Sequence, residues 1–213
     1  MLDNIITLHE KALFRRDMYR LISKLFLFPP TEEDLKAFKN SRLKHIFSEV
    51  FDIQAGSALK RLSYQEFCSE LREEFFAILS VPTSRYITPF ESVYQDKREI
   101  DGKDVGGLLG GKSMYDVAAV YEKAGFILSA SELPDHIGCE LGFIAMLTAK
   151  EAETIETGDE EKREKVKGLI STFIEQHLLK WFPKLIEKLS NDSSAKFYPA
   201  LAELTLAMLK KEI

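Results

Sequence analysis

Apolar residues return at every third or fourth position through most of this chain, and that spacing constrains its fold more than any other feature. The first series consists of Ile5, Leu8, Ala12, Met18, Leu21, Ile22, Leu25 and Phe26. This periodicity places one side of a helix against a core. No segment shows the regular apolar and polar alternation of a half-buried strand. The sequence therefore predicts an all-α fold, a single helical-bundle domain over residues 1–213.

Proline and capping residues mark where the first helices begin and end. Pro29 ends the first helix, and Thr31 is expected to cap the next. Ser63 and Glu66 stand at capping-box spacing before a helix that is expected to run to about Leu79. The residues expected on the inner face of that helix are Phe67, Leu71, Phe75 and Ile78.

The second half of the chain shows the same helical signals. A helix is expected to start at a Ser113 cap and to end at Gly125, where a left-handed residue is favoured. A longer helix should begin near Pro134, since proline is tolerated in a first turn. Its expected inner residues are Ile137, Leu141, Ile144 and Leu147. The last third predicts two or three more helices, the first broken near Pro183.

The segment 81–112 lacks sustained periodicity. It contains Pro82, Pro89 and five glycines, so we expect a long Pro/Gly-containing loop between two helical halves. Structureless loops of this length are uncommon inside a compact domain and often bind ligands. We therefore look for function here first.

Within that segment, "GGLLGGKS" (106–113) matches the phosphate-binding pattern G-x-x-x-x-G-K-[ST]. A phosphate-binding loop needs a buried strand before it and a helix after it. The preceding residues, "KREIDGKDV", are predicted to form a charged turn rather than a strand. The favoured interpretation is that Ser113 caps a helix and Lys112 is solvated. A nucleotide-binding protein or enzyme that uses Gly106–Ser113 stays as the alternative.

The charge balance argues against a nucleic-acid partner. The chain has 29 Lys and Arg against 34 Asp and Glu, a net charge of −5, which suits a basic peptide better. Cys68 and Cys139 form no motif, so a reducing compartment is expected. No apolar run is long enough to span a membrane, and no export signal is seen, so we expect a cytoplasmic protein without membrane insertion.

The densest polar cluster is "SELPDH", with Glu132, Asp135 and His136 at the head of the long helix. The positive end of the helix dipole favours an ionised Asp135 and a neutral His136. His136 and Glu140 have metal-ligand spacing, but two ligands do not make a metal site. Cys139 beside His136 lacks a third orienting group, so no active site is predicted.

A second cluster is "TPFESVY" in the long loop, with Phe90, Glu91 and Tyr94. One interpretation is that Phe90 and Tyr94 fold back and seal the core. The other is that an aromatic anchor beside carboxylates binds a peptide with apolar and cationic side chains.

Three motifs stand in the order and spacing of a known family: "PFESVY" (89–94), "ELPDH" (132–136) and "HLLKWFP" (177–183). The chain resembles, over essentially its whole length, the TorD/DmsD/NarJ-like redox-enzyme maturation chaperones. The E-x-P-D-H element is the most specific part of the resemblance. Some relatives carry Trp where this chain has Phe90, so its leader preference is expected to differ.

The resemblance implies an all-helical chaperone that is not an enzyme and needs no cofactor. Its implied partners are the N-terminal twin-arginine leader and the apo form of a molybdopterin oxidoreductase subunit, which it holds back from export until cofactor insertion and folding are complete. His177 and Trp181 are expected to pack the last helices. The long loop is compatible with a monomer or a domain-swapped dimer. The implied leader-binding residues are Phe90, Glu91, Tyr94, Glu132, Asp135 and His136.

Overall fold

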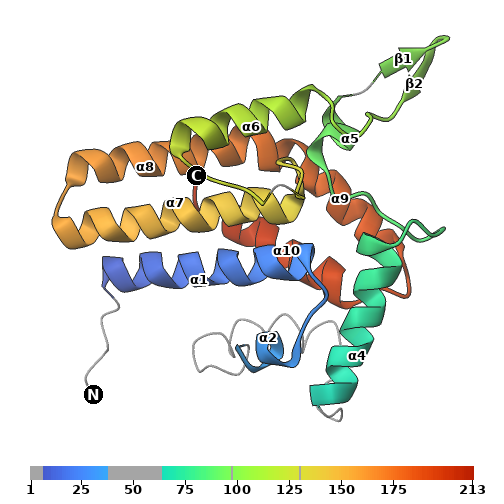
Figure 1. Cartoon of the computed structure of the whole chain (residues 1–213), viewed down its shortest axis with the longest axis horizontal. Helices are drawn as coiled ribbons and strands as arrows, with labels where there is room; N and C mark the ends of the chain where they lie inside the picture. Colours follow the sequence, from blue (N-terminus) through green and yellow to red (C-terminus); the bar gives the residue numbers. More distant parts are fainter. Residues whose placement is uncertain (1–6, 38–63, 97, 130) are drawn as a thin grey trace. The chain divides into compact units, whose positions relative to one another are not determined.

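A computed structural model describes residues 7–37, 64–96, 98–129 and 131–213 of the chain (Figure 1). The expectations for Ile5 and for a Ser63 cap lie outside these residues. The helices are α1 (Leu8–Leu27), α2 (Glu32–Ala37), α4 (Tyr64–Phe75), α5 (Glu91–Gln95), α6 (Lys112–Ala124), α7 (Ile137–Thr157), α8 (Glu160–Phe173), α9 (Leu179–Asn191) and α10 (Phe197–Leu209), with π-helical turns η2 (Phe76–Ser80) and η3 (Ile174–Leu178). The all-α prediction is confirmed, with one small hairpin added.

The chain divides into two compact units, each built from segments distant in sequence. The first unit contains Met1–Lys24, Phe90–Trp181 and Glu212–Ile213. The second contains Leu25–Pro89 and Phe182–Lys211. All six residues implied as leader-binding lie in the first unit.

Helix α7 is the centre of the first unit, and α8 packs along it (Figure 1). The residues predicted to face inward from α7 are all buried, namely Ile137, Leu141, Ile144 and Leu147. On another side of α7, Ser23 of α1 donates a hydrogen bond to the Gly138 carbonyl at 2.6 Å. Arg15 of α1 forms an ion pair with Glu151 near the other end of α7.

An aromatic cluster joins α6, α7 and α8. The Tyr121 ring lies 4.7 Å from the Phe143 ring and 4.9 Å from the Phe126 ring, centroid to centroid. Phe143 lies 4.7 Å from Phe173 in the same way. Such rings contribute large buried areas and favour tilted or edge-to-face contacts. The cluster therefore fixes α6 against the α7–α8 pair.

The second unit has its own aromatic core. The Tyr198 ring of α10 lies 5.9 Å from Phe26 and 6.1 Å from Phe75. At the start of α2, the amide of Asp34 donates to the Thr31 hydroxyl at 3.3 Å, which confirms the predicted cap.

Glu74 of α4 caps a helix that is distant in the sequence. Its carboxylate accepts hydrogen bonds from the amides of Lys196, Phe197 and Tyr198 at the start of α10, at 2.8–3.2 Å. Free amides at a helix start need acceptors, and here another helix supplies them.

The predicted loop over 81–112 contains α5 and a hairpin of β1 (Arg98–Ile100) and β2 (Lys103–Val105). The prediction that the residues before Gly106 form only a charged turn is therefore wrong. Asp101 and Gly102 both have positive φ, 52° and 73°, as a two-residue hairpin turn requires. Each strand is only three residues long, too short for alternation to show in the sequence.

Pro183 does not break the helix near the C-terminus, as the sequence predicted. It lies inside α9. Because it stands near the start of that helix, its missing N–H leaves only the Leu179 carbonyl, at the first residue of α9, without its helical donor.

Candidate functional site

Phe90 in the loop and His136 at the head of α7 lie side by side, although they are 46 positions apart in the sequence. Phe90 and His136 form an isolated antiparallel bridge. The Glu91 amide donates to the Asp135 carbonyl at 2.9 Å. The rings of Phe90 and His136 meet edge to face with centroids 4.9 Å apart. The structure thus brings the "PFESVY" and "ELPDH" segments together.

Asp135 is completely buried, and it caps a helix. Its Oδ2 accepts a hydrogen bond from the Ser92 amide at 3.0 Å, at the N-terminus of α5. A carboxylate in that position satisfies a free amide and complements the helix dipole. Asp135 therefore fixes α5 to the head of α7 and presents no charge to the surface.

His136 is the N-cap of α7. Its Nδ1 accepts a hydrogen bond from the Gly138 amide at 3.0 Å, so Nδ1 carries no proton and the ring proton is on Nε2. Burial lowers the pKa of His136 to about 4. The helix dipole was expected to favour a neutral imidazole, and burial favours the same state.

Glu91 and Tyr94 point into the first unit. The Glu91 carboxylate lies 2.9 Å from Nδ1 of His177, and both side chains are buried. The Tyr94 ring lies 5.4 Å from the Trp181 ring. For Tyr94 this agrees with the interpretation in which the loop aromatics seal the core, whereas Phe90 remains partly exposed. The packing expected of His177 and Trp181 is also seen.

Glu140 is buried close to Glu91, and the sequence analysis considered it only as a metal ligand. It is fully buried, and its Oε2 accepts a hydrogen bond from Trp181 Nε1 at 3.2 Å. Burial raises the pKa of Glu140 well above its ordinary value, and the nearby Glu91 carboxylate raises it further. Burial also raises the pKa of Glu91, although His177 opposes this shift. The raised pKa favours the protonated form of Glu140, and the Glu91 carboxylate lies within hydrogen-bond distance of His177.

The three motifs of the resemblance thus meet in the interior of one unit. Glu91 comes from the first motif, Asp135 from the second, and His177 and Trp181 from the third. Nothing in the local sequence of each motif indicates its partners, because every one of these contacts is long-range. We refer to Glu91, Asp135, Glu140, His177 and Trp181 as the buried network.

Of the six residues implied as leader-binding, Phe90, Glu132 and His136 remain partly exposed. The rings of Phe90 and His136 form an aromatic surface, and the Glu132 carboxylate accepts a hydrogen bond from the Cys139 thiol at 3.9 Å. Cys139 is buried, and burial raises the pKa of its thiol, so it is a poor nucleophile. Within the described residues, no three His, Cys, Asp or Glu side chains are grouped as metal ligands.

The "GGLLGGKS" segment is shaped by packing against α5. A Cβ on Gly107 would lie 1.9 Å from the Ser92 carbonyl oxygen, and one on Gly111 would lie 2.2 Å from the Asp96 carboxylate. Asp96 accepts from the Ser113 amide at 2.8 Å and from the Ser113 hydroxyl at 2.7 Å. An acid therefore occupies the helix start where a phosphate would bind, and it would repel one.

The predicted Ser113 cap is wrong, because α6 begins at Lys112 and its N-cap is Gly111. The Lys112 side chain is exposed, as expected, and pairs with Asp116 on the same helix. No feature of this segment favours the nucleotide-binding alternative.

None of the helices in the described part of the chain combines the length and the apolar character needed to cross a membrane.

Comparison with known proteins places the chain in a family. The model of the nitrate reductase delta subunit family matches residues 34–187. The chain is 27% identical to the chaperone protein TorD of Vibrio cholerae serotype O1, over 100% of this chain and 94% of that protein. It is 28% identical to the TorD chaperone of Vibrio atlanticus, over 92% and 91% of the two chains.

A further relative is the probable Tat proofreading chaperone DmsD of Haemophilus influenzae, which is 23% identical over 90% of this chain and 86% of its own length. The family match covers more than half of the chain, and the relatives are matched over nearly their whole length. The chain therefore belongs to the TorD/DmsD/NarJ family of redox-enzyme maturation chaperones, and it is a chaperone rather than an enzyme.

Proposed function

We propose that this chaperone binds the N-terminal twin-arginine leader of a molybdenum-cofactor oxidoreductase subunit and assists its cofactor insertion, folding and export proofreading. The observation that carries the proposal is the contact between Phe90 and His136, with Glu132 in the same loop. The Haemophilus influenzae relative is a probable Tat proofreading chaperone, and this similarity supports the proposal.

The chemistry of this surface complements a leader of that kind. A leader offers paired guanidinium groups followed by an apolar stretch. The rings of Phe90 and His136 provide apolar area for the stretch, and the Glu132 carboxylate is an acceptor for a guanidinium. The net charge of −5 favours approach of a cationic segment.

The neutral state of His136 is part of the proposal. An imidazolium beside Glu132 would repel an arginine and compete for the carboxylate. Because burial lowers the pKa of His136 to about 4, the ring stays uncharged at neutral pH. It then acts as a flat apolar surface with one donor, the Nε2–H.

The six residues of the proposed site take two roles. Phe90, Glu132 and His136 contact the leader. Glu91, Tyr94 and Asp135 are buried, and they position the two segments that carry the contacting residues. A leader bound before export implies that the chaperone acts in the cytoplasm, and it can act there as a monomer or a domain-swapped dimer.

The test is isothermal titration calorimetry of the full chain with synthetic leader peptides of molybdopterin oxidoreductase subunits from the source organism, alongside scrambled versions. We expect the cognate leader to bind more tightly than its scrambled version. We expect Phe90→Ala to weaken binding by about 1–3 kcal/mol, as for an aromatic anchor. The control is Tyr115→Ala, an exposed aromatic on α6, which should leave binding unchanged. Equal affinity for native and scrambled leaders would instead indicate a helical scaffold without leader specificity.

A further inference from the structure

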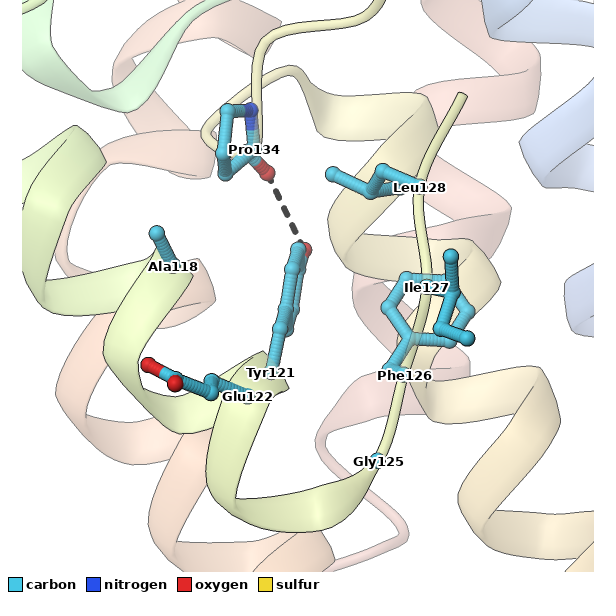
Figure 2. Close-up of a pocket in the computed structure, with 8 residues that line it drawn as sticks. All are labelled: Ala118, Tyr121, Glu122, Gly125, Phe126, Ile127, Leu128 and Pro134. Carbon is cyan, nitrogen blue, oxygen red and sulfur yellow. Dashed lines mark hydrogen bonds between the residues drawn. The ribbon is translucent and has the colours of Figure 1, made fainter. Parts of the chain in front are cut away.

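An open pocket of about 370 Å³ lies at the C-terminal end of α6, in the first unit (Figure 2). Ligand pockets commonly have volumes of about 300–1,000 Å³ and are mainly apolar. Glu122 is the one charged residue among those that line this pocket. The lining residues are Ala118, Tyr121, Glu122, Gly125, Phe126, Ile127, Leu128 and Pro134.

The local sequence explains why the pocket forms. Gly125 ends α6 in a left-handed conformation with φ 71°, and the chain then leaves the helix as an extended segment (Figure 2). The Phe126 ring turns inward and packs on Phe143 at 5.5 Å. Tyr121 points from α6 toward Pro134 and donates a hydrogen bond to its carbonyl at 3.0 Å, which holds the far wall in place (Figure 2).

The segment after Gly125 exposes an apolar side chain and backbone amides. Ile127 is 91% exposed, an unusual state for a branched apolar side chain beside an apolar pocket. Within the part of the chain that the structure describes, the backbone N–H groups of Ile127 and Leu128 form no hydrogen bond. An extended backbone with free donors can pair with a second extended chain.

The pocket adjoins the proposed leader site through one loop. Pro134 forms a wall of the pocket, and His136 in the same loop contacts Phe90. Two acids flank this loop and the pocket, Glu122 on the lining and Glu132 in the loop itself. The loop that carries His136 to the proposed leader site thus also supplies Pro134 to the pocket wall.

Resting on the proposed function, we propose that this pocket is a second subsite for the leader. It receives a large apolar side chain from the stretch that follows the paired arginines. The leader backbone runs beside Ile127 and Leu128, and a basic residue of the leader meets Glu122. Phe90 and the pocket then bind two separate side chains of the same peptide. Binding therefore depends on the spacing between these side chains as well as on their chemistry.

The experiment is fluorescence anisotropy with a fluorescein-labelled leader peptide, as used for calorimetry above, and the full-length chain. Ala118→Leu adds a side chain on the pocket wall and should weaken binding roughly tenfold, the loss expected from excluding one apolar side chain. The matched control is Ala119→Leu, at the neighbouring exposed position of α6, which should bind like the wild type. Circular dichroism melting checks that both variants fold.

Ile127→Ser provides a variant that cannot fail through misfolding, because the side chain is exposed. It should weaken leader binding several-fold and leave the melting temperature unchanged. If both Ala118→Leu and Ile127→Ser bind the leader like the wild type while Phe90→Ala does not, the pocket subsite is refuted and the proposed function stands. If the wild type does not distinguish the leader from its scrambled form, the proposed function itself fails.

A second copy of the chain is the competing occupant. Light scattering of the wild type and of Ile127→Ser, without peptide, separates the two. We expect the same mass for both proteins. A wild-type dimer that becomes a monomer in Ile127→Ser would assign the pocket to self-association and overturn the leader subsite.

Discussion

Asp135 is a polar residue of a family motif, yet it is buried and stabilises the fold rather than contacting a ligand. It joins α5 to the head of α7 by accepting from the Ser92 amide. We expect Asp135→Ala to lower the free energy of unfolding by about 1–2 kcal/mol, because the cap is lost and a buried amide is left unsatisfied. Urea denaturation measures this directly.

Asp135→Asn is the control for that substitution. Asparagine keeps an acceptor oxygen in nearly the same place, so its loss should be clearly smaller than that of Ala. If the Asp135→Ala and Asp135→Asn variants both have the urea midpoint of the wild type, Asp135 does not act as a cap.

Glu140 gives the buried network a pH dependence. Its pKa in the folded state lies well above the ordinary value of 4.5, so above pH 4.5 the folded chain keeps a proton that the unfolded chain releases. The stability contributed by this group is present at low pH and is lost as the pH rises toward the folded pKa. We expect Glu140→Gln, which stays neutral and can still accept from Trp181, to show a shallower decline in unfolding free energy between pH 5 and pH 8.

The control for this substitution is Glu153, an exposed acidic residue on the same helix, α7. Glu153→Gln should follow the wild-type pH profile. A Glu140→Gln profile that is parallel to the wild type would show that Glu140 titrates alike in the folded and unfolded chains.

The charge and burial of individual residues could be predicted only where the local sequence determines them. A neutral His136 was predicted from its place at a helix start, whereas in the structure burial lowers its pKa. The burial of Glu91, Asp135 and Glu140 could not be predicted, because charged residues are usually exposed and their partners lie in other motifs. The family motifs identified the important residues but not their interior position.

At the scale of elements, Gly125 carries the turn from α6 to the pocket segment. Its φ of 71° is unfavourable for any residue with a side chain, so Gly125→Ala should lower the unfolding free energy by about 1–2 kcal/mol. Gly168→Ala, inside α8 with open space around it, should instead raise it by roughly 0.5–1 kcal/mol. Thermal or urea unfolding of both variants checks the pair, and a shift of the same sign in both would contradict the assigned conformations.

Long elements with strong periodicity were predicted well, and short ones were not. The buried face of α7 and the glycine that ends α6 are where the sequence placed them. The β1–β2 hairpin was missed because its strands are short and charged, although the Asp101–Gly102 pair is a known hairpin signal. Gly111 is a fixed position of the phosphate-loop pattern, but the structure shows that it and the neighbouring Gly107 allow close packing against α5.

At the scale of the whole molecule, the all-α architecture and the family followed from the sequence, while the division into two units did not. Each unit is assembled from segments far apart in the chain, and contacts such as the Glu74 cap of α10 have no local signature. Periodicity predicts which side of a helix is buried, but it does not indicate which helix lies against it.

In the proposed complex, the leader lies over Phe90, His136 and the loop between α6 and α7. Hydrogen–deuterium exchange of the full chain, with and without a saturating cognate leader peptide, tests this placement. We predict slower exchange in residues 90–95 and 126–136 when the leader is present, with the exposed side of α8 unchanged. Protection that is confined to α8 or to the second unit, with no change in those two segments, would contradict the claim.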